Sequence, residues 1–169
     1  MDHIKNLKIV ITAGASGIGA EIAKTLSEAG GQVIICDKDQ SSLDAFAQNN
    51  PKVIAVKADV SNEEEVTSFF NEIKDHFGEI NSLINNAGIA GPSAKLEDTN
   101  FDDWKNTLSV NLNGTFLCTK SAIPLLRSAG GGSIINIGST SSFMGTPLRS
   151  SYSATKWGLI GLTKTWAME

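Results

Sequence analysis

Residues 8–19 read KIVITAGASGIG, a short apolar run followed by a glycine-rich turn. The run from Lys8 to Thr12 predicts a β-strand, and the amphipathic stretch from Gly17 to Ala29 predicts a helix directly after the turn. Glycines let the backbone turn tightly and approach a ligand, while the free N–H groups at a helix N-terminus attract a pyrophosphate. The stretch therefore predicts a strand-turn-helix unit that binds a dinucleotide. The residues expected to contact this cofactor are Gly14, Ser16, Gly17, Ile18 and Gly19.

The alternation of apolar runs and amphipathic segments continues along the chain. Further strands are predicted at Gln32–Asp37, Lys52–Lys57, Ser82–Asn85 and Ser133–Gly138, and further helices at Ser41–Gln48, Glu63–Phe77, Phe101–Arg127 and Ser151–Met168. The strands are continuous apolar runs, as expected for a parallel sheet that helices cover on both faces. We therefore predict an α/β fold: a doubly wound, Rossmann-type three-layer sheet in one domain over residues 1–169.

Composition and charge exclude several classes of function. The formal net charge is -4 and the 14 Lys and Arg residues are scattered, so neither nucleic acid nor an anionic membrane is an expected partner. The two cysteines, Cys36 and Cys118, form no disulfide framework, and with two distant histidines they suggest no metal site. The opening stretch Met1–Lys8 lacks the pattern of a secretion signal, and no apolar run is long enough to span a membrane. We expect a cytoplasmic protein without a metal.

An acidic residue at the end of the second predicted strand bears on the identity of the cofactor. Asp37 lies about 20 residues after the glycine turn, where a carboxylate can accept hydrogen bonds from both ribose hydroxyls. A carboxylate there also repels a 2′-phosphate, so NAD is expected in preference to NADP. Lys38 could instead attract that phosphate, and Asp37 could be an ordinary solvated turn residue.

Tyr152 and Lys156 form the second notable pattern, because residues four apart in a helix share one face. A free phenol loses its proton only well above neutral pH, but a nearby ammonium group favours the phenolate. Tyr152 is the only tyrosine in the chain, and with Lys156 beside it the side chain could take a proton from an alcohol or give one to a carbonyl. An exposed helical pair without function is the alternative.

Taken together, these motifs resemble the classical short-chain dehydrogenase/reductase family over essentially all 169 residues. The family's T-G-x-x-x-G-x-G motif falls on residues 12–19, its N-N-A-G motif on residues 85–88, and its Y-x-x-x-K motif on Tyr152 and Lys156. There is one departure, because Ala13 stands where the family has its first glycine. We expect a slightly shifted turn that uses Gly14.

The resemblance implies roles for further residues. Ser139, 13 residues before Tyr152, has the register of the family's catalytic serine and would donate a hydrogen bond to the substrate oxygen. Asn111 matches the fourth catalytic residue, which lies at a helix distortion and holds a water near Lys156; Asn113 is the neighbour that could be confused with it. Lys156 would also bind the nicotinamide ribose. The resemblance implies cofactor contacts at Asp59, Val60, Asn86, Ala87, Gly88, Tyr152 and Lys156.

The implied activity is hydride transfer between a nicotinamide cofactor, NAD or less readily NADP, and a secondary alcohol or carbonyl. An alcohol, a sugar or polyol, and a 3-oxoacyl thioester all remain open as substrates. A sugar-nucleotide epimerase of the extended branch is disfavoured because that branch uses G-x-x-G-x-x-G. A non-catalytic NAD-binding sensor is disfavoured by the complete set Asn111, Ser139, Tyr152 and Lys156. A flavodoxin-like signalling domain would have phosphate-acceptor carboxylates and no Tyr-Lys pair.

The last predicted helix reaches the end of the sequence without a following turn or strand. From the resemblance we expect the sequence to be the N-terminal portion of a longer domain that lacks here its C-terminal strands. The resemblance also implies a homo-oligomer, a dimer or tetramer, in the full-length form.

Overall fold

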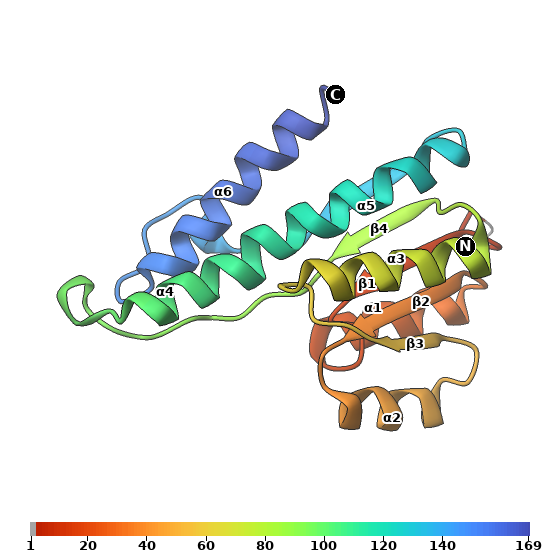
Figure 1. Cartoon of the computed structure of the whole chain (residues 1–169), viewed down its shortest axis with the longest axis horizontal. Helices are drawn as coiled ribbons and strands as arrows, with labels where there is room; N and C mark the ends of the chain where they lie inside the picture. The colour runs from red at the N-terminus through yellow and green to blue at the C-terminus, as the bar shows by residue number, and fades with distance from the viewer. Residues whose placement is uncertain (1–2) are drawn as a thin grey trace.

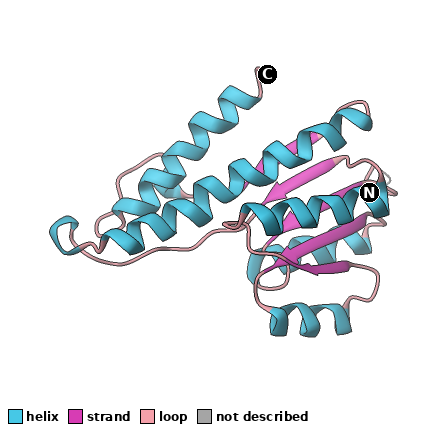
Figure 2. Ribbon diagram, in the orientation of Figure 1, coloured by secondary structure: helices cyan, strands magenta, loops and turns pink. Residues whose placement is uncertain are grey.

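The computed structural model describes residues 3–169; Met1 and Asp2, the first residues of the opening stretch, lie outside the described residues. Five strands form one sheet in the order β3-β2-β1-β4-β5, and all neighbouring strands are parallel. The strands are β1 (Lys8–Thr12), β2 (Gln32–Asp37), β3 (Ile54–Lys57), β4 (Ser82–Asn85) and β5 (Ser133–Asn136). The predicted Rossmann-type fold class is confirmed (Figure 2). Because the chain runs outward from β1 to β3 and then returns to β4, the strand order reverses between β1 and β4, where such sheets bind ligands.

Helices cover both faces of the sheet, and each face has its own apolar core. On one face lie α1 (Gly17–Glu28) and α2 (Gln40–Asn49), which pack against β1, β2 and β3. Their core includes Ile11, Ile35 and Leu43, all at most 2% exposed. On the other face lie α3 (Glu63–Phe77) and α5 (Gly114–Ser128), with Phe69, Ile73 and Ala122 in a second core. The strands β1, β2 and β4 are thus buried from both sides, as their sequences predict, whereas β3 and β5 at the edges of the sheet are partly exposed.

One long rod dominates the second face (Figure 1). It consists of α4 (Phe101–Leu108), a π-helical turn (Ser109–Asn113) and α5, and its α4 end extends beyond the sheet. The last helix, α6 (Ser150–Trp166), packs against α4. The predicted helical run from Phe101 to Arg127 is present, and it is interrupted at 109–113 by the π-helical turn, the kind of helix distortion that the resemblance implies at Asn111.

Two predicted strands are shorter than expected because local hydrogen bonds end them early. Lys52 lies in a turn in which the Val53 N–H donates to the Asn50 carbonyl at 3.0 Å. β3 therefore begins only at Ile54. β5 ends at Asn136; the Ile137 N–H still donates to the Asn85 carbonyl of β4 at 3.0 Å, and the chain leaves the sheet after this bond. Two short 3-10 helices, Leu96–Asp98 and Thr140–Ser142, lie in loops.

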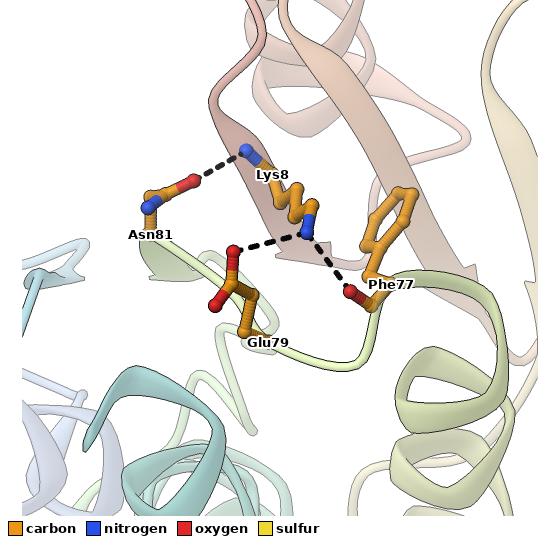
Figure 3. Close-up of polar contacts among 4 residues, drawn as sticks. All are labelled: Lys8, Phe77, Glu79 and Asn81. Atoms are coloured by element: carbon orange, nitrogen blue, oxygen red, sulfur yellow. Dashed lines mark hydrogen bonds and ion pairs between the residues drawn. The ribbon is translucent and has the colours of Figure 1, made fainter. Parts of the chain in front are cut away.

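Polar contacts of Lys8 fix the amino edge of the sheet (Figure 3). Its backbone N–H donates to Asn81 Oδ1 at 2.9 Å, which holds the start of β1 beside the start of β4. Its Nζ donates to the Phe77 carbonyl at 2.9 Å and pairs with Glu79 Oε1 at 3.1 Å. These bonds secure the turn between α3 and β4 at the end of the strands opposite the glycine loop. The carboxyl edge is the one where the predicted site residues gather. No helix within residues 3–169 is both long and apolar enough to cross a membrane.

Candidate active site

Ala13 makes the turn after β1 itself, so the expected shift onto Gly14 is wrong. Ala13 has φ +49°, in the left-handed region that usually costs an alanine about 1 kcal/mol, whereas Gly14 is not among the residues with positive φ. Gly14 is needed for a different reason. A Cβ at Gly14 would lie 2.6 Å from Ile35 Cβ, and the Gly14 N–H donates to the Cys36 carbonyl at 3.0 Å. Gly14 therefore lets the loop pack directly on β2.

The start of α1 leaves its backbone open to a ligand. Ser16 and Gly17 are exposed, Ile18 is 67% exposed, and the Ser16 side chain makes no capping hydrogen bond. The first N–H groups of α1 and the positive end of its dipole can therefore meet an anionic group. Gly17 takes φ +53°, and a Cβ at Gly19 would lie 2.2 Å from the Ala13 carbonyl oxygen. The predicted glycine motif thus forms a close cradle.

Asn86 acts on the glycine loop from the neighbouring strand. Its Nδ2 donates to the carbonyl oxygens of Thr12 (3.1 Å) and Ala13 (3.0 Å), and a Cβ at Gly19 would come within 2.5 Å of it. Thr12 Oγ1 in turn accepts from the N–H groups of Asn86 (3.1 Å) and Ala87 (3.0 Å). Of the predicted cofactor residues, Asn86 therefore positions the loop, while Ala87 and Gly88 line the pocket beside it.

A pocket of about 420 Å³ lies between the ends of β1, β2, β3 and β4. Its lining includes the predicted residues Asp37, Asp59, Val60, Ala87 and Gly88 together with Ala13 and Lys38. Sequence reasoning missed Ala58, Ile89 and Val110, which also line it and whose apolar side chains give no motif. The structure therefore brings five of the residues predicted to contact the cofactor together in one pocket.

Two carboxylates in this pocket are positioned by backbone bonds. Asp37 Oδ2 accepts from the Ala15 N–H at 3.3 Å, which ties the end of β2 to the glycine loop. Asp37 is 9% exposed, while its neighbour Lys38 is exposed. Asp59 Oδ1 accepts from the N–H and hydroxyl of Ser61 at 2.9 and 2.7 Å. Hydroxyl groups of a ribose can therefore meet a fixed carboxylate at Asp37, with a cation close by.

Asn111 lies in the π-helical turn, at a helix distortion, and is 1% exposed. Its Oδ1 accepts from the Ile89 N–H at 2.8 Å, and its Nδ2 donates to the Ile89 carbonyl at 2.9 Å. Asn113 is exposed and plays no such part. A Cβ at Gly88 would lie 3.5 Å from Asn111 Oδ1 and 3.8 Å from Lys156 Nζ. The N-N-A-G segment, Asn111 and Lys156 therefore meet at one place.

Lys156 and Tyr152 lie in the first turns of α6. Lys156 is 5% exposed, its Nζ donates to the Ile137 carbonyl at 2.7 Å, and Nζ lies 5.7 Å from the centroid of the Tyr152 ring. Burial lowers the pKa of the Lys156 ammonium group. The bond to Ile137 fixes this cation against the end of β5. The ammonium group is thus held beside both the tyrosine ring and the N-N-A-G segment.

Ser139 begins the 3-10 helix that follows β5. Its Oγ accepts from the Ser141 N–H at 3.1 Å, and its N–H donates to Ser142 Oγ at 3.1 Å, which makes a capping box. Ser141 and Ser142 are buried, whereas Ser139 is half-buried. Because Oγ serves as an acceptor in this bond, its proton can still be donated. Ser139 can therefore donate to a substrate oxygen, whereas Ser141 and Ser142 in the same loop are buried.

Thr155, which the motif analysis did not single out, connects two of the predicted catalytic residues. Its side chain is fully buried, and Oγ1 accepts from Asn111 Nδ2 at 3.1 Å. The same hydroxyl donates to the Tyr152 carbonyl at 2.7 Å. The only sequence signal was its place inside the Y-x-x-x-K motif, directly before the lysine. Thr155 thus joins the π-helical turn to α6.

Arg149 is a second residue that sequence reasoning missed. Its Nη1 donates to the carbonyl oxygens of Ala90 (3.2 Å) and Gly91 (2.9 Å), in the segment after β4. Beside it, the Leu148 carbonyl accepts from the Ala94 N–H at 3.1 Å, although Leu148 has φ +63°. These bonds attach the segment after the N-N-A-G motif to the start of α6. Within residues 3–169, no three His, Cys, Asp or Glu side chains gather in a way that could hold a metal ion.

Comparison with known proteins places this geometry in a family. The family model described as "short chain dehydrogenase" matches residues 7–169 of this chain. The chain belongs to the short-chain dehydrogenase family. The predicted family is therefore confirmed.

Individual members of the family match over nearly the whole chain. The oxidoreductase YxbG of Bacillus subtilis (strain 168) is 39% identical over 173 residues, which cover 100% of this chain and 63% of YxbG. Trans-4-hydroxycyclohexanecarboxylate dehydrogenase of Sinomonas cyclohexanicum is 35% identical, over 99% of this chain and 68% of that enzyme. The crystal structure of levodione reductase superposes with a TM-score of 0.92 at 30% identity, over 97% of this chain and 66% of that one. The chain therefore spans about two thirds of the length of the short-chain dehydrogenases it matches.

Proposed function

We propose that the protein is an NAD(P)-dependent oxidoreductase that moves hydride between a nicotinamide cofactor and a secondary alcohol or carbonyl. One observation carries the proposal: the buried Lys156 ammonium group lies beside the Tyr152 ring and 3.8 Å from where a Cβ at Gly88 would be. The acid/base pair and the N-N-A-G segment thus meet at the carboxyl edge of the sheet. A Tyr-Lys pair on an exposed helix face would not have this arrangement.

The residues at the carboxyl edge fit a nicotinamide dinucleotide. The exposed N-terminus of α1 suits a pyrophosphate, and the Asp37 carboxylate in the adjacent pocket suits ribose hydroxyls. A Cβ at Gly19 would overlap the Ala13 carbonyl oxygen, whereas a Cβ at Gly88 would make only ordinary contact with the Asn111 amide, at 3.5 Å. The bound nicotinamide ring would supply or accept the hydride.

The protein's own side chains would manage the proton. Tyr152 gives its hydroxyl proton to the substrate oxygen during carbonyl reduction, and takes it back during alcohol oxidation. Lys156 holds its positive charge 5.7 Å from the centroid of the Tyr152 ring, on the side where the proton is transferred. Ser139 donates a hydrogen bond to the same substrate oxygen as negative charge develops on it. Asn111 holds the backbone of Ile89 and so keeps the N-N-A-G segment in place.

Substitution of Tyr152 by Phe tests the proposal. In the full-length protein, Tyr152→Phe should lower kcat/KM for alcohol oxidation by about 10²-fold or more, because general acid/base catalysis contributes that much. Affinity for the nicotinamide cofactor should change little, since the ring remains. Trp166→Phe, at the far end of the same helix, is the matched control and should retain activity. Near-normal turnover in Tyr152→Phe would refute the assignment.

The cofactor is proposed to be NAD rather than NADP, on the basis of Asp37. Its fixed carboxylate at the pocket wall would repel a 2′-phosphate, while Lys38 is exposed beside it. The ratio of kcat/KM for NAD to that for NADP should exceed one, and Asp37→Ala should reduce this ratio by about tenfold. A native enzyme that prefers NADP would overturn this choice and point to Lys38.

We also propose a substrate class, a homo-oligomeric assembly and a cytoplasmic location. The substrate is a secondary alcohol or carbonyl, with an alcohol, a sugar or polyol, and a 3-oxoacyl thioester as candidates. A homo-oligomer, a dimer or tetramer, is supported by exposed aromatic residues on the outer faces of the long helices: Phe101, Phe116 and Trp157. A cytoplasmic location is supported by the free thiols of Cys36 and Cys118.

A further inference from the structure

Ala13 is held in its left-handed conformation by contacts on its carbonyl side. Its oxygen accepts from Asn86 Nδ2 at 3.0 Å, and the same amide group holds the Thr12 carbonyl at 3.1 Å. Gly19 packs so closely that a Cβ there would lie 2.2 Å from the Ala13 oxygen. The carbonyl of Ala13 therefore cannot rotate to relieve the strain of φ +49° without breaking these contacts.

The amide side of Ala13 is also engaged. The peptide bond on that side is held through the Thr12 carbonyl, which accepts from Asn86 Nδ2 at 3.1 Å. The peptide bonds before and after Ala13 are thus both held, while the residue itself is half-exposed and lines the pocket with Asp37 and Lys38. Its methyl group is the only side-chain group that Ala13 can present to this pocket.

From this geometry, and resting on the proposed function, we propose that the Ala13 methyl group is a determinant of cofactor affinity. It occupies space beside Asp37 that a glycine would leave open, so the adenosine half of the cofactor is held less tightly. Glycine at such a turn allows a ligand to approach the backbone directly, and a side chain prevents that approach. Because the loop is fixed on both sides of Ala13, it cannot move the methyl group out of the pocket.

Ala13→Gly in the full chain tests this inference with isolated halves of the cofactor. Dissociation constants for ADP, NAD⁺ and nicotinamide mononucleotide would be measured by calorimetry for the native protein and the variant. ADP and NAD⁺ should bind about 3- to 10-fold more tightly to Ala13→Gly, while nicotinamide mononucleotide should bind equally to both. Unchanged or weaker ADP binding by the variant would overturn the inference.

Thermal unfolding without nucleotide gives a second readout. Ala13→Gly removes left-handed strain, so its melting temperature should not fall below that of the native protein. Ala29→Gly is the matched control, because Ala29 has φ -76° and carries no left-handed strain that glycine could relieve. Glycine there only raises the conformational entropy of the unfolded chain, so the melting temperature of this variant should fall. An equal fall in both variants would contradict the strained geometry. If ADP, NAD⁺ and NADP⁺ all fail to bind the native protein and Ala13→Gly alike, the proposed function itself is refuted, and the inference with it.

Discussion

Lys156 combines a positive charge with nearly complete burial. It is 5% exposed, and burial lowers the pKa of its ammonium group below the ordinary value of 10.5. When the folded-state pKa of a lysine is lowered, the unfolded chain holds the proton more tightly than the folded protein does. The charged lysine therefore weakens the folded state at neutral pH. This penalty diminishes as the pH rises from the lowered pKa toward 10.5.

We expect Lys156→Met to change how stability depends on pH. As the pH rises from neutral toward 10.5, the free energy of unfolding of the native protein should increase relative to that of the variant, because only the native protein sheds the buried proton. Urea unfolding at several pH values would measure the difference. Lys164→Met, an exposed lysine on the same helix, is the control and should show no such drift. A difference that stays constant across the range would contradict the prediction.

The residues that carry chemistry could be predicted from the sequence, but several that position them could not. Tyr152, Lys156 and Asp37 stand at fixed spacings within motifs, so local pattern was enough. Thr155 and Arg149 act through partners 44 and 58 residues or more away in the chain, and no local pattern marks such contacts. The left-handed conformation of Ala13 was also missed, because it depends on Asn86 and Gly19.

At the scale of elements, the start of α6 and the segment after β4 form one unit. Arg149 contacts Ala90 and Gly91 from one side, and Asn111 holds Ile89 from the other while also contacting Thr155. A Cβ at Gly91 would lie 2.6 Å from Thr107 Oγ1 and 3.0 Å from Ser151 Oγ, so the segment also packs tightly against α4 and α6. The position of Tyr152 relative to the N-N-A-G segment therefore depends on these bonds.

Arg149→Ala should loosen this unit and impair catalysis more than cofactor binding. We expect kcat to fall between about 10- and 100-fold, because misplacement by ~1 Å can have that effect. The free energy of unfolding should fall by about 1–3 kcal/mol through the loss of charged hydrogen bonds. Arg149→Lys keeps the charge and one donor, so it should recover part of kcat. Steady-state kinetics and urea unfolding of both variants would check this; an unchanged kcat in Arg149→Ala would show that the bonds are not needed.

Element types were predictable because period and composition are local properties, whereas their exact ends were not. The rod from Phe101 to Ser128 is helical although Pro124 lies within α5, and the π-helical turn was indicated only by the resemblance at Asn111, not by composition. Likewise, β3 starts later and β5 ends earlier than predicted. A turn closed by the bond from the Val53 N–H to the Asn50 carbonyl precedes β3, and β5 ends just before the bond from the Ile137 N–H to the Asn85 carbonyl.

For the molecule as a whole, one part of the sheet lacks a cover within residues 3–169. A groove of about 1000 Å³ runs between α1 and the strands β1, β4 and β5, and its walls are mostly apolar, with Ile22, Leu26, Ile84 and Ile137 among them. Ile135, on the edge strand β5, lines the same groove and is 46% exposed. Apolar surface next to an open strand edge favours association with another chain.

Residues 1–169 expressed alone should therefore self-associate. Ile135→Lys should reduce that association, because a charge on an edge strand opposes pairing between strands. Leu96→Lys is the control: Leu96 is 72% exposed but lies in a loop away from the sheet, and its replacement should leave association unchanged. Sedimentation velocity over a range of concentrations would measure the effect. A monomer in the unsubstituted chain, or equal effects of both variants, would contradict the role of this groove.

The π-helical turn places the two halves of the long rod out of phase with each other. It accommodates one residue more than an α-helical turn would, and each residue in a helix advances the face by about 100°. Because of this offset, α4 packs on α6 while α5 packs on β4 and α3. Deleting any one residue from 109–113 would bring the halves into phase, and either Asn111 would leave Ile89 or the apolar side of α5 would leave the sheet. Insertions or deletions in residues 109–113 would therefore disrupt the packing of this rod, because they change the angular offset between α4 and α5. Substitutions that keep its length would not change this offset.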